Sequence, residues 1–187
     1  AIVQKNMAVK IIFNIIFLVI LSVLQFAFIP LMPIYLSNLN LILVSLIFIF
    51  FLFGLNRALW WAAGGGFILD SVSFFPFGSF LFAYFGSAII VYFLFKHFFT
   101  NRSVYSFVAL AFFGSLFYAL IFYFYNYFFG LEGDNAVSFL NSVFWLNFMM
   151  QIIFNVSFVF VGFYLMNFTT KKFNPVFLGK KYFKFKD

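Results

Sequence analysis

Asp70 is the residue whose type and position could do chemistry, because it is a carboxylate inside an apolar stretch. It follows three consecutive glycines in the segment Trp61-Ala-Ala-Gly-Gly-Gly-Phe-Ile-Leu-Asp70. A carboxylate near the middle of a bilayer costs about 2.5 to 3.5 kcal/mol on insertion scales, so it should face protein or water. Two roles are open. In the first, Asp70 lies near the outer interface and ends its helix by bonding backbone groups. In the second, it organises the turn at Pro76 and Gly78 and holds a groove for a partner.

Catalytic readings of Asp70 lack a second group. Intramembrane aspartyl proteases and lipoprotein signal peptidases need two facing carboxylates, and the sequence offers no membrane-embedded partner for this one. It also contains no His-Glu zinc motif, no phosphate-binding glycine loop with a lysine and no serine beside a base. Cys is absent and His97 is the single histidine, which excludes thiolate and multi-histidine metal sites. We therefore expect a protein that is not an enzyme, with no catalytic residue, metal or cofactor.

Gly64, Gly65 and Gly66 form a thin helix surface. In lipid, small residues let two helix backbones approach closely and so promote helix association. We expect a tight helix crossing, either within the chain or with the helix of a partner. A broken helix that lines a binding site, as in transporters, is the alternative interpretation.

Amide side chains recur in the last apolar segment. Asn147, Gln151 and Asn155 are spaced by four residues, so they lie on one face of a helix. Buried amides usually form hydrogen bonds between helices, and a polar pocket for a small ligand is the alternative. The first apolar segment carries a looser stripe of Asn14, Ser22 and Gln25.

The carboxyl-terminal tail, residues 171–187, alternates lysines with aromatic residues. Next to a membrane such a segment should bind anionic lipid headgroups at about 1 kcal/mol per cation, and nucleic acid is a poor alternative. The lysines concerned are Lys171, Lys172, Lys180, Lys181, Lys184 and Lys186.

The elements that must position these residues are membrane spans. Of the 187 residues, 66% are hydrophobic and 8% charged, too few charges to cover a soluble domain. A span needs roughly 20 apolar residues, so the chain can hold six. We predict an all-α polytopic domain over residues 1–170, followed by the tail. Its six transmembrane helices lie at about 11–29, 41–55, 58–75, 80–95, 104–129 and 139–168.

Charge predicts the orientation of these spans. In a six-span arrangement all the basic residues fall on one side, and the positive-inside rule makes that side, with both termini, cytoplasmic. The acidic residues Glu132 and Asp134 fall in an outer loop. The basic residues outside the tail are Lys5, Lys10, Arg57, Lys96 and Arg102.

The segment around Asp70 resembles the MreD family of bacterial rod shape-determining membrane proteins. The likeness consists of Gly66-Phe-Ile-Leu-Asp70, then Pro76-Phe-Gly78, then the aromatic and small-residue run Ala83-Tyr84-Phe85-Gly86, within a six-span hydropathy profile. In this family Gly-x-x-x-Asp and Pro-x-Gly lie between the third and fourth spans. By resemblance, Gly66, Asp70, Pro76 and Gly78 shape that turn, and the glycine face is a candidate seat for a partner helix.

The resemblance implies a multi-pass protein of the bacterial inner (cytoplasmic) membrane that acts as a scaffold in cell elongation and peptidoglycan synthesis. Its implied partners are an MreC-like single-span protein, a RodA-type glycosyltransferase, the elongation transpeptidase and the MreB cytoskeleton. The implied fold is similar to that of the substrate-binding subunits of energy-coupling-factor transporters. A solute-binding subunit of a vitamin transporter is therefore the alternative function.

Overall fold

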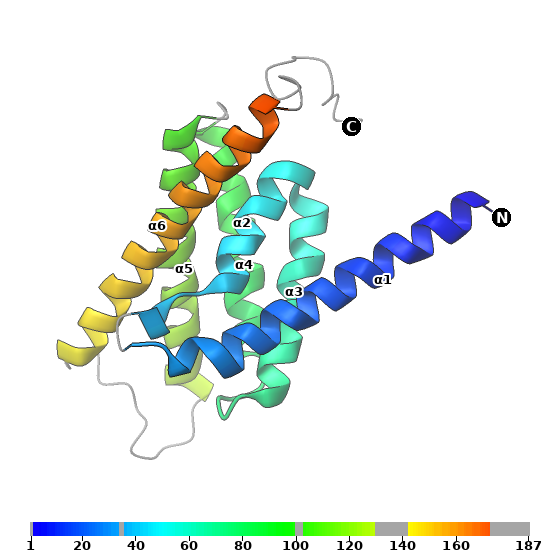
Figure 1. The fold of residues 1–187 in the computed structure, drawn as a ribbon. Helices are drawn as coiled ribbons and strands as arrows, with labels where there is room; N and C mark the ends of the chain where they lie inside the picture. Colours follow the sequence, from blue (N-terminus) through cyan, green and yellow to red (C-terminus); the bar gives the residue numbers. More distant parts are fainter. Residues whose placement is uncertain (1, 34–35, 100–102, 130–141, 173–187) are drawn as a thin grey trace.

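The described residues fold into helices. The structure is a computed structural model that describes residues 2–33, 36–99, 103–129 and 142–172, and these residues contain no strand. An all-α fold is therefore confirmed for the described part of the chain (Figure 1). The α-helices are α1 (Ile2–Val23), α2 (Leu41–Phe53), α3 (Leu55–Val72), α4 (Ser79–His97), α5 (Val104–Phe129) and α6 (Ser142–Lys172).

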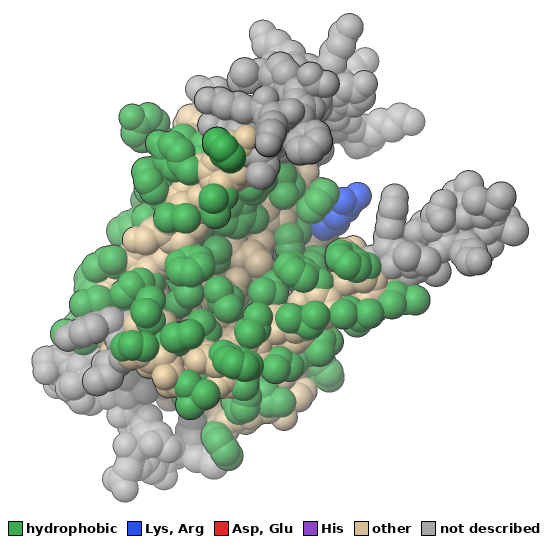
Figure 2. Space-filling view, viewed as in Figure 1, with side chains coloured by type: hydrophobic (Ala, Val, Ile, Leu, Met, Phe, Trp, Pro, Cys, Tyr) green, Lys and Arg blue, Asp and Glu red, His purple; other side chains and the backbone are tan. Residues whose placement is uncertain are grey.

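The membrane character of the protein is supported by four long apolar segments. They are Ile12–Leu31, Ser79–His97, Val104–Phe129 and Trp145–Met166. The face drawn in Figure 2 is covered largely by hydrophobic side chains. α2 has 13 residues and a length of about 20 Å, less than the roughly 30 Å of a hydrocarbon core. The crossing of all six helices, and the cytoplasmic position of both termini, stay predictions.

Helix α2 lies at the centre of the bundle formed by α2 to α6. Its apolar residues point in every direction, as expected of a helix that is buried all round. α2 ends at Gly54, whose φ of +86° breaks the helix, and α3 begins at the next residue. The sequence predicts a second helix that ends at 55 and a third that starts at 58. In the structure the two helices are separated by Gly54 alone. The buried residues of α2 are Ile42, Leu43, Val44, Leu46, Ile47, Ile49, Phe50 and Phe51.

Helix α1 lies largely outside this bundle. It crosses α3 and then continues away from the other helices toward the amino terminus (Figure 1). Only 11% of its apolar segment is buried, against 22–39% in the other three long segments. At the crossing, the ring of Phe17 meets Trp61 edge-on at 5.7 Å between centroids. The first helix is therefore attached to the bundle mainly through its second half.

The end of the first span is not a regular α-helix. A π-helical turn, Leu24–Phe28, follows α1 and is succeeded by a 3-10 turn, Ile29–Leu31, that contains Pro30. Proline has no N–H to continue an α-helix, which explains the stop. α6 extends beyond the predicted limit of 168, and the predicted start at 139 lies outside the described residues, as do Arg102, Glu132 and Asp134.

Candidate functional site

Asp70 caps the helix that follows it in the chain. It lies in the last turn of α3 and is 4% exposed. Its two carboxylate oxygens accept hydrogen bonds from the backbone N–H groups of Phe80, at 2.9 Å, and Leu81, at 3.0 Å. These are the second and third residues of α4, whose amides normally bind the side chain of the residue preceding the helix. That residue is Gly78, which has no side chain, so Asp70 supplies the cap from α3.

Gly66 lies one helical turn before Asp70 and makes this cap possible. A Cβ atom at Gly66 would lie 2.5 Å from the Cα atom of Leu81 and 2.9 Å from its nitrogen. The obstructing atoms belong to the backbone of α4, which cannot rotate out of the way. The backbones of α3 and α4 therefore touch where the carboxylate of Asp70 binds the amides. Gly66 and Asp70 act together on the first turn of α4.

The turn between α3 and α4 is also held by α5. Gly78 has φ of +102°, and the N–H and the hydroxyl of Ser79 both donate to the carbonyl of Pro76, at 3.1 and 2.7 Å. The hydroxyl of Tyr125 in α5 donates to the carbonyl of Phe77 at 2.8 Å. Pro76 and Gly78 thus lie in the turn that the sequence assigns to them, where hydrogen bonds within the chain fix their backbone.

The three glycines face three different helices of the same chain. A Cβ at Gly64 would meet Leu18 of α1 at 3.2 Å, and one at Gly65 would meet Ile42 of α2 at 2.9 Å. Gly66 meets α4. Since α3 is continuous through all three positions, the alternative of a broken helix is wrong. Within the chain the glycine face packs against α1, α2 and α4, and its role as a seat for a partner helix stays a prediction.

A second polar cluster surrounds Asn40 at the start of α2. The Oδ1 atom of Asn40 accepts from the N–H of Leu43 at 3.0 Å and from the hydroxyl of Tyr84 at 2.8 Å. Its own N–H donates to Oδ1 of Asn155 at 2.9 Å, and Nδ2 of Asn155 donates to the hydroxyl of Ser115 at 3.0 Å. All five residues are buried. The cluster joins α2, α4, α5 and α6.

Gln25 attaches the first span to the same place. Its Oε1 atom accepts from the N–H of Leu41 at 2.7 Å, and its Nε2 atom donates to the carbonyl of Leu39 at 3.1 Å. The amide of Gln25 therefore binds the backbone on both sides of Asn40. An unsatisfied backbone group inside a bilayer costs several kcal/mol. Three N–H groups at this helix start, those of Asn40, Leu41 and Leu43, are thus bound by side chains, which belong to Asn155, Gln25 and Asn40.

The predicted amide stripe of α6 lies partly on this cluster. Asn155 is at its centre, and Oδ1 of Asn147 accepts a hydrogen bond of 3.4 Å from Nδ2 of Asn38. Gln151 is half-buried between them. In the first span, Ser22 binds the carbonyl of Leu18 within its own helix and Asn14 is exposed. Hydrogen bonds to other segments of the chain therefore explain why Asn147 and Asn155 carry polar side chains in this apolar helix.

Several members of these clusters were not predicted from the sequence. Asn40 was visible as an N-cap residue directly before an apolar run, which is a recognisable signal. Tyr84 was noted only as part of the run Ala83-Tyr84-Phe85-Gly86, and Ser115 gave no signal, because it is a single polar residue within an apolar helix. Lys171 and Lys172 are the last two residues of α6. The other tail lysines, Lys180, Lys181, Lys184 and Lys186, lie outside the described residues.

These arrangements fix helices in place, and nothing in their geometry places a nucleophile beside a base. Both oxygens of Asp70 bind backbone amides, and the described residues contain no group of three His, Cys, Asp or Glu side chains that could hold a metal ion. Fold and site together define a polytopic helical membrane protein with internally bonded polar groups. The chain matches no protein-family model, no curated protein and no solved structure.

Proposed function

We propose that this protein is a non-enzymatic membrane scaffold of the MreD type, which works in the elongation complex of the bacterial cytoplasmic membrane. The observation that carries the proposal is the use of Asp70. Its carboxylate, the most chemically distinctive group in the apolar region, is consumed in capping α4 beside Gly66. The segment that resembles the MreD pattern thereby builds a rigid junction between helices, which suits a protein that positions others.

The surface we assign to a partner helix is α1. Because the glycine face is covered by the chain itself, the most exposed apolar helix is the better candidate. Ile12, Ile16 and Ile20 follow one another at four-residue spacing on one side of α1, and their exposed fractions are 56, 53 and 50%. A single-span MreC-like protein offers one helix of matching apolar character. The RodA-type glycosyltransferase, the elongation transpeptidase and MreB would then be reached through this pair.

Co-purification from the native membrane tests the proposal. The tagged chain should recover an MreC-like single-span protein, and the triple substitution Ile12→Ala, Ile16→Ala and Ile20→Ala should reduce recovery roughly tenfold, the equivalent of about 1.4 kcal/mol. A matched control replaces three exposed residues of α6 by Ala, namely Ile153, Val161 and Leu165, with exposed fractions of 54, 54 and 63%. Equal recovery in the two variants would refute the seat on α1, and the absence of any such partner would refute the scaffold.

The solute-binding alternative has less support. It depends on a polar stripe that is free to bind a ligand, and Asn155 is bonded to both Asn40 and Ser115. Native mass spectrometry of the mildly extracted protein discriminates the two functions. A vitamin-sized molecule retained at one per chain would favour the transporter subunit.

A further inference from the structure

Gln151 is the member of the α6 amide stripe that the fold itself does not use. Its neighbours in the stripe, Asn147 and Asn155, both form hydrogen bonds with other segments of the chain. The side chain of Gln151 is half-buried and forms no hydrogen bond with the residues that the structure describes. A glutamine amide offers two N–H donors and one acceptor oxygen. These groups are therefore available to a further partner.

The depth of Gln151 in its helix makes an unpaired amide costly. The apolar segment Trp145–Met166 has 22 residues, about 33 Å, close to the thickness of a hydrocarbon core. Tryptophan favours the membrane interface, so Trp145 marks one end of this segment. Gln151 follows six residues later, about 9 Å along the helix axis. No water reaches that depth, so we expect the amide to be paired in the membrane.

Helix α6 leaves much of its surface free for such a partner. It packs mainly on α5, α2 and the turn Leu36–Asn38, and it forms one side of the bundle in Figure 1. Only 22% of its apolar segment is buried, against 33 and 39% for those of α4 and α5. Beside Gln151, at helical spacing, Phe154 is half-buried and Phe158 is 45% exposed. We call these three residues the Gln151 face.

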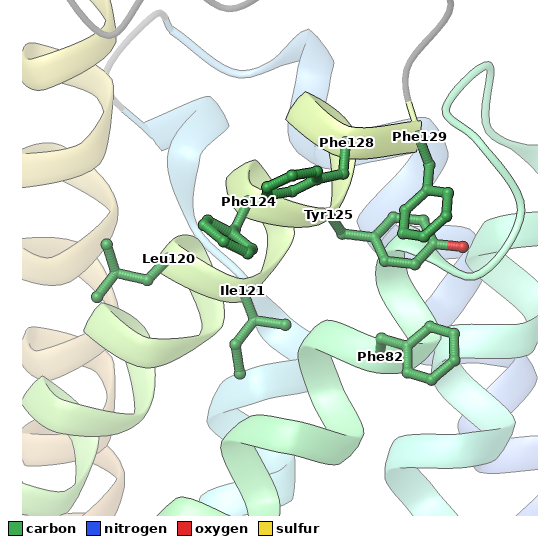
Figure 3. Close-up of a pocket in the computed structure, with 7 residues that line it drawn as sticks. All are labelled: Phe82, Leu120, Ile121, Phe124, Tyr125, Phe128 and Phe129. Atoms are coloured by element: carbon green, nitrogen blue, oxygen red, sulfur yellow. The ribbon is translucent and has the colours of Figure 1, made fainter.

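The apolar hollow beside α5 offers no comparable anchor. The side chains labelled in Figure 3 come from α4 and α5 and enclose about 980 Å³. The one side-chain oxygen among them, the hydroxyl of Tyr125, already donates to the carbonyl of Phe77 at 2.8 Å. Lipid and protein are equally apolar, so a surface of this kind selects neither. The Gln151 face differs because it carries a polar group that has to be matched.

We propose that the Gln151 face binds the same face of a second copy of the chain. Copies of one protein insert into a membrane in the same orientation, so their Gln151 side chains lie at equal depth. Each amide both donates and accepts, so two of them can exchange a pair of hydrogen bonds across a twofold axis. Amide side chains hold transmembrane helices together in this way. A different partner would need its own polar group at the matching depth.

The dimer leaves the exposed side of α1 free and requires no other protein. It therefore stands or falls independently of the scaffold function.

Disulfide cross-linking tests the dimer in membranes of the expressing cell, where all copies share one orientation. The sequence contains no cysteine, so one introduced cysteine reports one position. Phe158→Cys lies on the Gln151 face. Phe160→Cys is the matched control, since Phe160 points to another side of α6 with 44% exposure. We expect at least fivefold more dimer, identified by its mass, from Phe158→Cys. Equal cross-linking at both positions, or cross-linking of Phe158→Cys to a different protein, would overturn the proposal.

Substitution of the amide provides the second test. In the Phe158→Cys background, Gln151→Leu should lower the cross-linked dimer at least fivefold, the equivalent of about 1 kcal/mol. Gln151→Asn keeps an amide and should retain more dimer than Gln151→Leu. Ser157→Leu is the control, because it also makes α6 more apolar but removes a hydroxyl already bound to the carbonyl of Ile153, at 2.7 Å. An unchanged free energy of unfolding would show that Gln151→Leu still folds. Equal cross-linking in the Gln151→Leu and Ser157→Leu variants would refute the pairing of the amides.

Discussion

Replacing Asp70 by Ala should loosen the start of α4 without changing the rest of the bundle. The substitution removes two hydrogen bonds at once, those to the backbone N–H groups of Phe80 and Leu81. Water cannot easily replace them, because Asp70 is 4% exposed. Hydrogen bonds to charged groups contribute about 1.5 to 3 kcal/mol each, and loss of an N-cap costs about 0.5 to 2 kcal/mol. Removing a buried carboxylate offsets part of this loss, so we expect a net destabilisation of about 2 kcal/mol.

The assay is reversible unfolding in mixed micelles with increasing mole fractions of a denaturing detergent. Ser71→Ala is the matched control, since Ser71 is the next residue, is exposed, and binds only the carbonyl of Phe67 in its own helix, at 2.8 Å. It should change the free energy of unfolding by less than about 0.5 kcal/mol. Asp70→Asn keeps one acceptor oxygen and should lie between the control and Asp70→Ala.

Amide hydrogen exchange locates the effect. In Asp70→Ala the amides of Phe80 and Leu81 should exchange faster, while amides in the middle of α5 keep their protection. Two results would contradict this role of the carboxylate: Asp70→Ala and Ser71→Ala unfold alike, or the two capped amides remain as protected as in the wild type. Either result would mean that the carboxylate contributes nothing to this helix start.

Three further substitutions separate the remaining contacts. Gly66→Ala should cost about 1 to 3 kcal/mol in the same unfolding assay, because the added Cβ meets the backbone of α4. Gly64→Ala should cost far less, because its Cβ meets the flexible end of the Leu18 side chain. Similar losses in the two variants would contradict the close approach of α3 and α4. Asn155→Ala should cost about 1 to 3 kcal/mol, because it leaves the buried N–H of Asn40 and hydroxyl of Ser115 without this hydrogen-bond partner, against almost nothing for a Ser157→Ala control. Gln25→Ala should accelerate exchange of the Leu41 amide and free the first span, and unchanged exchange would show that the side chain is dispensable.

The local order of helices was predictable from sequence, because long apolar runs and their polar interruptions depend only on neighbouring residues. The break near residue 54 follows from a glycine beside polar residues. The π-helical turn, Leu24–Phe28, was not predictable, because the contacts of its residue Gln25 are with the backbone of Leu39 and Leu41, fourteen and sixteen residues away. The unusual backbone turn and the long-range hydrogen bonds occur at the same residue.

The role of Asp70 shows a different limit. Its isolation in an apolar segment indicated that it must bond to the protein, and two roles for it were open. The sequence could not reveal which backbone amides it binds, because a helix cap is normally supplied by the residue directly before the helix. Here that residue is a glycine, and the capping carboxylate belongs to Asp70, ten residues before Phe80, the first of the two capped residues. Only the packing of α3 against α4 through Gly66 brings the carboxylate there.

Gly66 and Asp70 should therefore behave as one unit, and a double-mutant cycle can measure this. Alanine at Gly66 pushes α4 away, after which the carboxylate of Asp70 can no longer reach both amides. Much of the cap is then already lost, so adding Asp70→Ala should cost much less than it does in the wild type. We expect the double variant to fall short of the sum of the single effects by about 1 kcal/mol or more, within the range of residues that share a contact. Additive losses would mean that the helix crossing and the cap are independent, and that the junction is not the rigid unit on which the scaffold proposal depends.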